Sequence, residues 1–579
     1  MSPIDIPLNP IPQGWRWLTG RIWGIERAFG RAHEEGRAED DTRLRIFFVL
    51  ALFALAFLAL AAGAARSALF SDGDRADAAG APPGDRADLV DRNGRLLAVD
   101  LPHFGLYFDP KENWNPDEVR RVLPAVVPEL SIERLDKALK ADRRQYLVGG
   151  LTPAERDRID DLGLPGLSFE PEPKRVYVLG PTAGHLICFV DRGGIGISGA
   201  ELGLDKQIRA NAGKGPVALS IDLRVQAVLQ DEVQQAAETF RAQGAAGIVT
   251  DVHTGEILAM TSYPAFDPSK LGEVPVADMT NHVTSTVYEP GSVMKVFTLA
   301  MGIDSGLVDI NTVMDTTTPL VIGSQNIRDD EHSATNLHIW EVFTHSSNVG
   351  AARLGLRAGP DRLEHYFRAF GLYQAAPSEL IESARPLVAR KLTDNTVASM
   401  SFGQAISVTP LAVATGMNAV MNGGVYVPLT IRKLGPGEVP QGRRVISEAT
   451  SRTMLDLMRM NATMGTGKAA DAAAPGYRLG GKTGTAQKAV NGHYASGQRV
   501  SSFAAVFPTD GAMSDPRYFV FILLDNPQPT KDTAGFAMAA QTAAPAAGRV
   551  VERIAPILGI RRGPATPPVV VAHNAKTAR

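Results

Sequence analysis

The longest uninterrupted apolar run in the chain lies near its N-terminus, over residues 46–65. It contains IFFVLALFALAFLALAAGAA, twenty positions without a charged side chain. At about 1.5 Å rise per residue, such a helix covers a hydrocarbon core about 30 Å thick. Forty-five residues precede the run, more than the short charged start of a secretory signal peptide. The pattern therefore predicts an uncleaved transmembrane helix over residues 46–65.

Arginine residues flank this apolar run unequally. Four lie shortly before it and two lie after it: Arg31, Arg37, Arg43 and Arg45 on one side, and Arg66 and Arg75 on the other. By the positive-inside rule, the arginine-rich side stays in the cytoplasm. We therefore expect a cytoplasmic tail over 1–45, a single crossing of the inner membrane, and a periplasmic location for everything that follows.

Apolar residues within the tail recur at three- and four-residue spacing, so they would line one stripe of a helix. They are Trp15, Leu18, Ile22, Ile25 and Phe29. The stripe is compatible with an interfacial helix or a docking face for a membrane partner. A chance pattern in the tail is an equally open alternative.

Polar and small residues divide the rest of the chain. Residues 66–88 include a stretch rich in Gly, Pro and Asp, which predicts a linker. Residues 89–215 alternate short apolar runs with turns and predict a first domain outside the membrane. From residue 217 the pattern changes to a strand followed by an amphipathic helix, which the Asp222 side chain can cap.

Residues 216–562 predict an α+β domain, followed by a C-terminal tail over 563–579. A hairpin, a mostly helical segment, three strands and a closing helix are expected over 245–262, 292–460, 477–488, 501–508, 517–525 and 534–558. Two strands, a helical insert, three strands and a last helix fit an antiparallel sheet flanked by helices.

Composition excludes several classes of function. Of 579 residues, 44% are apolar and 21% charged, and the net charge is −3, so neither disorder nor a basic nucleic-acid surface is indicated. Cys188 is the only cysteine, which excludes an intramolecular disulfide framework and a cysteine-rich zinc site. We expect no metal, no cofactor and no nucleic-acid partner.

A first candidate for catalysis is the sequence Pro290-Gly291-Ser292-Val293-Met294-Lys295. Pro-Gly ends the preceding chain and an apolar periodic run follows, so Ser292 should lie in the first turn of a helix. Positions three apart share a helix face, which brings the Lys295 amine near the Ser292 hydroxyl. A serine needs a base to become nucleophilic, and a lysine can act as that base if burial or a second cation keeps it neutral.

A second candidate is Ser346-Ser347-Asn348, which supplies the pattern S-x-N. Ser346 can relay a proton and Asn348 can hold a substrate amide. Serine and asparagine are equally common in caps and turns, and Ser324-Gln325-Asn326 fits the same pattern. The motif gains meaning only together with the others.

A third candidate, Lys482-Thr483-Gly484-Thr485, admits two interpretations. Gly476 to Thr483 satisfies the phosphate-loop pattern G-x-x-x-x-G-K-T of nucleotide-binding proteins. That loop needs a strand before it and a helix after it, whereas a turn signal, Asn491-Gly492, follows here. We therefore favour a strand, with Lys482 pointing into a cleft, Thr483 and Thr485 binding substrate, and Gly484 admitting a peptide backbone.

The three motifs, in this order, resemble those of the penicillin-binding protein and serine β-lactamase superfamily. Upstream and downstream segments resemble class B penicillin-binding proteins in particular: Arg86–Ala98, Arg175–Tyr177, His185, Gly196–Glu201, Gln404 and Thr409–Leu411. The similarity covers most of residues 86–560. The chain departs from the family pattern at Ala87, Val178 and Ala505, which leaves local packing there open and the chemistry intact.

The resemblance implies a pedestal of the penicillin-binding protein dimerisation type over 89–215 and a transpeptidase domain over 216–562. It also implies a peptidoglycan D,D-transpeptidase that acts on stem peptides ending in D-Ala-D-Ala and is acylated by β-lactams. Ser292 would be the nucleophile, Lys295 its base, and Lys482 the group that holds the substrate carboxylate. The N–H groups of Ser292 and Thr485 would form the oxyanion hole.

Chain length, one membrane span and a moderate pedestal resemble the division-specific enzymes most closely. These work at the septum with a membrane-embedded glycosyltransferase and other division proteins. Four alternatives remain open: an elongation-specific class B enzyme, a β-lactamase or β-lactam sensor, a structural protein with an inactive site and, remotely, a phosphate-loop nucleotide-binding protein.

Overall fold

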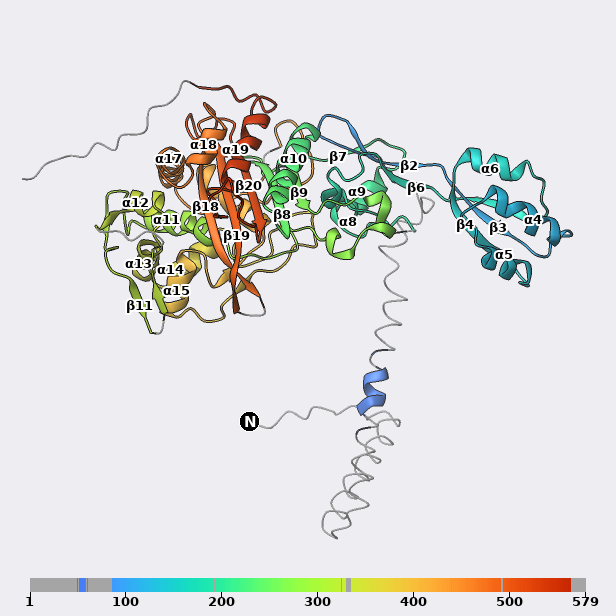
Figure 1. Ribbon diagram of the computed structural model, residues 1–579, viewed down its shortest axis with the longest axis horizontal. Coiled ribbons are helices and arrows are strands. Elements are labelled where there is room, and N and C mark those ends of the chain that lie inside the picture. Colours follow the sequence, from blue (N-terminus) through green and yellow to red (C-terminus); the bar gives the residue numbers. More distant parts are fainter. Residues whose placement is uncertain are drawn as a thin grey trace, which may run out of the picture. The chain divides into compact units, whose positions relative to one another are not determined.

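The computed structural model describes most of the chain after residue 85 (Figure 1). The described residues are 49, 52–58, 60, 86–191, 193–323, 325–329, 335–438, 440–490 and 493–563. Within this part, no helix is both long and apolar enough to cross a membrane. The expected cytoplasmic tail, nearly all of the expected linker and C-terminal tail, and much of the expected membrane helix lie outside the described residues. Met1–Pro82 and Pro83–Arg579 form two separate units, and the second is described below.

The first part of this unit contains a small α/β layer. Strands β3 (Phe104–Phe108), β4 (Gln145–Leu151) and β5 (Leu167–Pro171) form a sheet in the order β4-β3-β5. Helices α4 (Pro116–Val126), α5 (Ile132–Leu139) and α6 (Pro153–Asp160) bury their apolar faces in the same hydrophobic core. Polar side chains cap each of these helices, and α6 begins with a complete capping box from Thr152 and Glu155.

A second sheet connects this layer to the catalytic part, in the order β6-β2-β1-β7. Its strands are β1 (Leu89–Val90), β2 (Leu96–Leu101), β6 (Lys174–Tyr177) and β7 (Val217–Ala218). Three short helices, α7 (Gly184–Ile187), α8 (Gly199–Gly203) and α9 (Asp205–Ala210), pack beside it. Four segments that resemble the class B family lie in or beside this sheet: Arg86–Ala98, Arg175–Tyr177, His185 and Gly196–Glu201.

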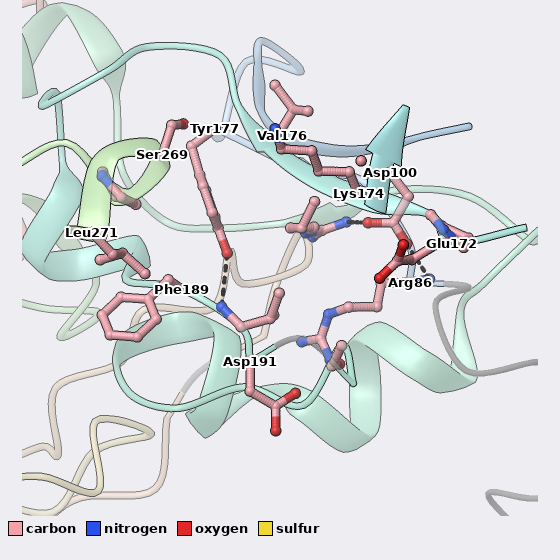
Figure 2. Close-up of a pocket in the computed structure, with 16 residues that line it drawn as sticks. Arg86, Asp100, Glu172, Lys174, Val176, Tyr177, Phe189, Asp191, Ser269 and Leu271 are labelled. Atoms are coloured by element: carbon pink, nitrogen blue, oxygen red, sulfur yellow. Dashed lines mark hydrogen bonds and ion pairs between the residues drawn. The ribbon is translucent and has the colours of Figure 1, made fainter. Parts of the chain in front are cut away.

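A buried charge network ties the elements of this second sheet together. The Glu201 carboxylate accepts hydrogen bonds from Arg86 Nη2 at 2.6 Å and from Arg175 Nε at 2.8 Å, and it is completely buried. Arg175 also binds Asp100. Figure 2 shows Arg86 and Asp100 beside a pocket of about 330 Å³. Because carboxylates already bind both guanidinium groups that line it, the pocket forms part of a structural network.

Five antiparallel strands form the centre of the catalytic part, in the order β18-β19-β20-β8-β9. They are β8 (Gly244–Asp251), β9 (Ile257–Tyr263), β18 (Gly480–Val490), β19 (His493–Phe507) and β20 (Tyr518–Asp525). The expected hairpin and the three expected strands are thereby confirmed. Strand β18 lies at an edge of this sheet.

Alternate residues of the strands enter two different cores, one on each face of the sheet. Phe503 and Ala505 pack with α10 (Leu223–Thr239) and α19 (Ala543–Ile554), which lie together along the sheet in Figure 1. Ala504 and Val506 belong to the core of the other face. A sheet covered by helices on both faces explains why β20 is apolar at nearly every position.

The helical insert between β9 and β18 supplies the second cover of the sheet. Its larger helices are α11 (Met294–Asp304), α12 (Ile339–Thr344), α13 (Asn348–Ala358), α14 (Pro360–Ala369), α15 (Asp394–Ser401), α16 (Pro410–Met421), α17 (Glu448–Met464) and α18 (Lys468–Ala473). The residues of α16 are all buried, as expected for a helix that is apolar on all sides. Two-stranded ribbons interrupt this segment: β10 (Val313–Met314) with β13 (Leu337–His338), β11 (Leu320–Ile322) with β12 (Gln325–Ile327), β14 (Leu387–Val388) with β15 (Ile406–Ser407), and β16 (Val425–Tyr426) with β17 (Arg443–Arg444).

Two local expectations have different outcomes. The expected cap of α10 is confirmed, because the Asp222 carboxylate accepts a hydrogen bond from the Arg224 N–H at 2.9 Å. The closing helix was expected over 534–558, but α19 begins only at Ala543. Ala534 and Gly535 have φ of 52° and 83°, in the left-handed region that a right-handed helix cannot contain. Alanine content alone therefore overestimates this helix by nine residues at its start and four at its end, about three and a half turns.

Candidate active site

Ser292 lies in a tight turn, η3 (Gly291–Val293), that leads directly into α11. The Gly291 N–H donates to the Gly403 carbonyl at 3.1 Å, and Gly291 has φ of +55°. A Cβ at this position would lie 2.8 Å from the Thr485 carbonyl oxygen. Glycine is therefore required to press the Ser292 turn against strand β18.

Lys295 follows one turn later and is completely buried. Its Nζ lies 2.9 Å from Ser292 Oγ, 2.7 Å from Asn348 Oδ1 and 3.1 Å from Ser346 Oγ. It also donates to the Ser346 carbonyl oxygen. The amine is therefore in direct contact with the serine hydroxyl and with both polar groups of the S-x-N motif.

Ser346 connects the two lysines of the site. It lies between α12 and α13 with φ of +60°, an uncommon conformation for a non-glycine residue. Its Oγ is 3.1 Å from Lys295 Nζ and 2.9 Å from Lys482 Nζ. One hydroxyl therefore bridges two amines, an arrangement through which a proton can pass from one to the other.

Lys482 is completely buried on strand β18. Besides Ser346 Oγ, its Nζ contacts the Thr483 carbonyl oxygen at 3.3 Å and lies 5.8 Å from the centre of the Phe343 ring. Burial, and then the charge of Lys295, lower the pKa of Lys482 well below its usual value. The site thus disfavours two protonated lysines, and an incoming anion would relieve that electrostatic cost.

The remaining residues of the third motif alternate along β18. The Thr483 hydroxyl lies 2.7 Å from the Thr466 hydroxyl, and the Thr485 hydroxyl accepts a hydrogen bond from the Ala539 N–H at 3.2 Å. Gly484 is closely surrounded within the protein. A Cβ there would lie 2.7 Å from the Pro290 carbonyl oxygen and 2.5 Å from Ser502 Oγ. Its small size serves packing of the strand against the Ser292 turn inside the protein.

One residue at the site has no counterpart in the sequence motifs. Asp329 accepts hydrogen bonds from the Val349 N–H at 3.0 Å and from the Asn348 N–H, and its other oxygen accepts from the Ser347 hydroxyl at 2.7 Å. These contacts fix the start of α13, and with it the Asn348 side chain. The only signal in the sequence is an acidic residue some eighteen positions upstream, for which no spacing rule exists.

The same geometry separates the competing interpretations of two motifs. Strand β18 continues through Lys482 and is followed by β19, not by a helix, so the strand–loop–helix context of a phosphate loop is absent there. Of the two S-x-N matches, the one at Ser346 meets Lys295, whereas Asn326 lies exposed in a short ribbon. No group of three metal-ligating side chains occurs within the described residues.

Comparison with known families places this geometry in context. Residues 245–548 match the penicillin-binding protein transpeptidase domain, and residues 81–238 match the penicillin-binding protein dimerisation domain. The chain belongs to the class B penicillin-binding proteins. The expected fold is confirmed in its main features: a transpeptidase domain of this family joined to a dimerisation-type pedestal.

Similar proteins include enzymes of cell-wall synthesis. The chain is 49% identical to the probable peptidoglycan D,D-transpeptidase FtsI of Caulobacter vibrioides, over 97% of this chain and 96% of that protein. It is 32% identical to the peptidoglycan D,D-transpeptidase FtsI of Escherichia coli, over 78% and 80%. Penicillin-binding protein 3 of Mycobacterium tuberculosis, in complex with ampicillin, has a TM-score of 0.65 and 27% identity, over 84% of this chain and 98% of that one.

Proposed function

We propose that this chain is a peptidoglycan D,D-transpeptidase that cross-links stem peptides at the division septum and is acylated by β-lactams. The observation that carries the proposal is the contact of 2.9 Å between Lys295 Nζ and Ser292 Oγ, with Ser346 Oγ linking that amine to Lys482. The similarity to FtsI proteins along nearly the whole chain supports the same activity.

The proposed reaction begins when Ser292 Oγ attacks the carbonyl carbon of the penultimate D-Ala. A neutral Lys295 takes the hydroxyl proton as the new C–O bond forms. The N–H groups of Ser292 and Thr485 stabilise the oxyanion. The C–N bond then breaks, and the proton reaches the departing amine through Ser346 Oγ, so D-Ala leaves as a neutral amine. An amine of a second stem peptide attacks the ester, which restores the Ser292 hydroxyl and completes the cross-link.

The lysine pair provides a reason for the neutral base. Burial, and then the charge of Lys295, lower the pKa of Lys482, so the site disfavours protons on both amines at once. A substrate carboxylate beside Lys482 would hold the remaining proton there and leave Lys295 free to accept another. Strand β18 supports peptide binding as well, because an edge strand offers unpaired backbone groups to an extended ligand.

Fluorescent penicillin tests the proposed nucleophile. We expect the full-length protein to form one covalent adduct on Ser292, located by peptide mass spectrometry, and Ser292→Ala to form none. Lys295→Ala should lose acylation at neutral pH. An adduct on Ser346, or labelling that persists in Ser292→Ala, would exclude the mechanism. Fast release of the adduct would favour a β-lactamase, and an inert site would favour a structural role.

We further propose that residues 1–45 lie in the cytoplasm, that 46–65 cross the inner membrane, and that the pedestal (89–215) and catalytic domain (216–562) are periplasmic. An alkaline phosphatase fusion after residue 90 should be active, and one before residue 45 inactive. The reverse result would place the catalytic domain in the cytoplasm and exclude a role in the cell wall.

The proposed septal role implies a membrane-embedded glycosyltransferase of the division machinery as partner. Depletion should give filaments with unfinished septa, and a fluorescent fusion should gather at midcell. Rounded cells with fluorescence along the side wall would instead assign the chain to elongation.

A further inference from the structure

A second carboxylate lies close to the nucleophile, and the proposed mechanism does not use it. Glu289 is three residues before Ser292, and the strands and loops around it are those of the active site. Its Oε1 accepts hydrogen bonds from the Ala405 N–H at 2.8 Å and from the Tyr494 hydroxyl at 3.1 Å. Ala405 belongs to the loop that holds the Ser292 turn, because the Gly403 carbonyl accepts from Gly291.

The Glu289 carboxylate lacks a cationic partner among the described residues. It is partly buried, and its hydrogen-bond donors are a backbone N–H and a phenol, both neutral. Burial raises the pKa of Glu289, while the hydrogen bonds from Ala405 and Tyr494 oppose that rise. An ammonium group of a ligand would stabilise a partly buried carboxylate that has no cationic partner, because a charge-assisted hydrogen bond replaces the hydration lost on burial.

The course of β18 shows where such a group would come from. A peptide with its carboxylate at Lys482 and its reactive carbonyl near Ser292 runs antiparallel to β18, so its preceding residues extend past Thr485 toward Gln487. Tyr494 lies in that direction, on β19, where it pairs with Ala489. Four residues of strand separate Thr485 from Ala489, about 13 Å. A long amine-bearing side chain one residue before D-Ala-D-Ala can cover much of this distance.

We propose that Glu289 and Tyr494 form a subsite, beside Ser292, for the ammonium group of a stem peptide. The inference rests on the proposed transpeptidase function and adds a determinant of substrate choice. The donor peptide, which acylates Ser292, and the acceptor peptide, whose amine attacks the ester, both carry a side-chain amine. Either peptide can therefore supply the ammonium group. A donor would be held before acylation, and an acceptor would be held while its amine waits to attack the ester.

Glu289→Gln is the decisive variant. Glutamine retains an oxygen that can accept from Ala405 and Tyr494, so the loop keeps its hydrogen bonds and only the negative charge is lost. Glu172→Gln is the matched control, because Glu172 also contacts a tyrosine hydroxyl, that of Tyr146 at 3.4 Å, and lies in the pedestal. Fluorescent penicillin should label Ser292 equally in both variants and in the unmodified protein.

Two assays on the full-length protein separate the sources of the ammonium group. The first compares release of D-Ala from a synthetic stem peptide that has a free side-chain amine with release from the same peptide acetylated on that amine. The second measures the ratio of cross-linked to hydrolysed product with a free-amine acceptor peptide. We expect Glu289→Gln to lower either the release of D-Ala from the free-amine peptide or the ratio of cross-linked to hydrolysed product. The decrease should be about tenfold or more, as expected for loss of a charge-assisted hydrogen bond.

Each outcome has a distinct meaning. A loss confined to the free-amine donor assigns the subsite to the donor, and a loss confined to the product ratio assigns it to the acceptor. Equal rates for Glu289→Gln and the unmodified protein in both assays, with penicillin labelling intact, would overturn the subsite and leave the transpeptidase proposal standing. Absence of penicillin labelling in the unmodified protein would overturn the transpeptidase proposal itself.

Discussion

At the scale of single residues, the site depends on local spacing and on contacts between residues far apart in the sequence. The pair Ser292 and Lys295 could be predicted, because residues three apart meet on any helical turn. The approach of Ser346 and Lys482 to that pair was inferred from family resemblance, since no rule of spacing connects residues so far apart. Asp329 escaped notice for the same reason, although it holds the start of α13 through three hydrogen bonds.

We predict that Asp329→Ala impairs acylation more than folding. Helix α13 would keep its cap, because the Ser347 hydroxyl accepts from the Gly350 N–H at 2.9 Å, so stability should fall by only about 1 kcal/mol. Asn348 would lose the carboxylate that fixes it, and the rate of penicillin acylation should fall about ten- to hundredfold. Stopped-flow acylation and thermal unfolding measure the two effects separately.

Asp267→Ala provides the comparison for Asp329. Asp267 also caps a helix, the short η1 (Pro268–Glu273), where it accepts from the Ser269 N–H at 2.9 Å. Its loss should leave acylation unchanged. Equal acylation rates in the two variants would show that Asp329 does not position the site.

At the scale of elements, strand β18 packs against two parts of the protein, the neighbouring strand β19 and the Ser292 turn. The positions of the strands in the central sheet could be predicted from the sequence, because apolar residues recur in runs of strand length. The sequence could not show that one side of Gly484 meets the Ser292 turn, because that contact depends on the fold of the insert between them. The short ribbons in that insert escaped detection too, since strands of two or three residues carry almost no periodic signal.

We predict that Gly484→Ala destabilises the protein and slows acylation. The new Cβ would lie 2.7 Å from the Pro290 carbonyl oxygen and 2.9 Å from Val293 Cγ2, so the strand and the Ser292 turn must move apart. Overpacking of this kind costs about 1–3 kcal/mol. Acylation should slow as well, because Ser292 follows Pro290 by two residues. Thermal unfolding and penicillin acylation measure the two losses.

Gly272→Ala is the corresponding control, since a Cβ at Gly272 meets nothing within 4 Å. It should leave both the unfolding midpoint and the acylation rate as they are. If Gly484→Ala also left the unfolding midpoint and the acylation rate unchanged, the strand would tolerate a Cβ beside the Ser292 turn. The packing role of Gly484 would then be wrong.

At the scale of the whole molecule, the pedestal and the catalytic part meet through a buried histidine. His185, in α7, is 4% exposed, and its Nε2 lies 2.8 Å from the carbonyl oxygen of Asp278. Asp278 belongs to η2 (Val276–Met279), in the helical insert. Asn281 from the same segment donates to the His185 carbonyl at 3.3 Å. His185 lies in a segment that resembles the family, but no pattern in the sequence predicts its contact with Asp278.

This contact predicts a loss of stability in mild acid. Burial, the largest cause, lowers the pKa of His185 to about 4 from 6.5, with a smaller contribution from nearby His282, while the hydrogen bond to Asp278 acts in the opposite direction. Between these two pH values the unfolded chain binds a proton that the folded protein does not. Stability should therefore fall as the pH drops from about 6.5 to 4, by up to about 3 kcal/mol from this group alone.

We predict that His185→Gln makes stability less sensitive to pH over that interval. Glutamine can still donate to the Asp278 carbonyl but does not titrate, so the variant should lose less stability than the unmodified protein between pH 7 and pH 4. Urea unfolding at a series of pH values measures the difference, and His365→Gln, at an exposed position of α14, controls for removal of an imidazole. If the pH profiles of His185→Gln and the unmodified protein ran parallel, His185 would have to be protonated as readily in the folded state as in the unfolded one. The junction between pedestal and catalytic part would then owe none of its acid sensitivity to this residue.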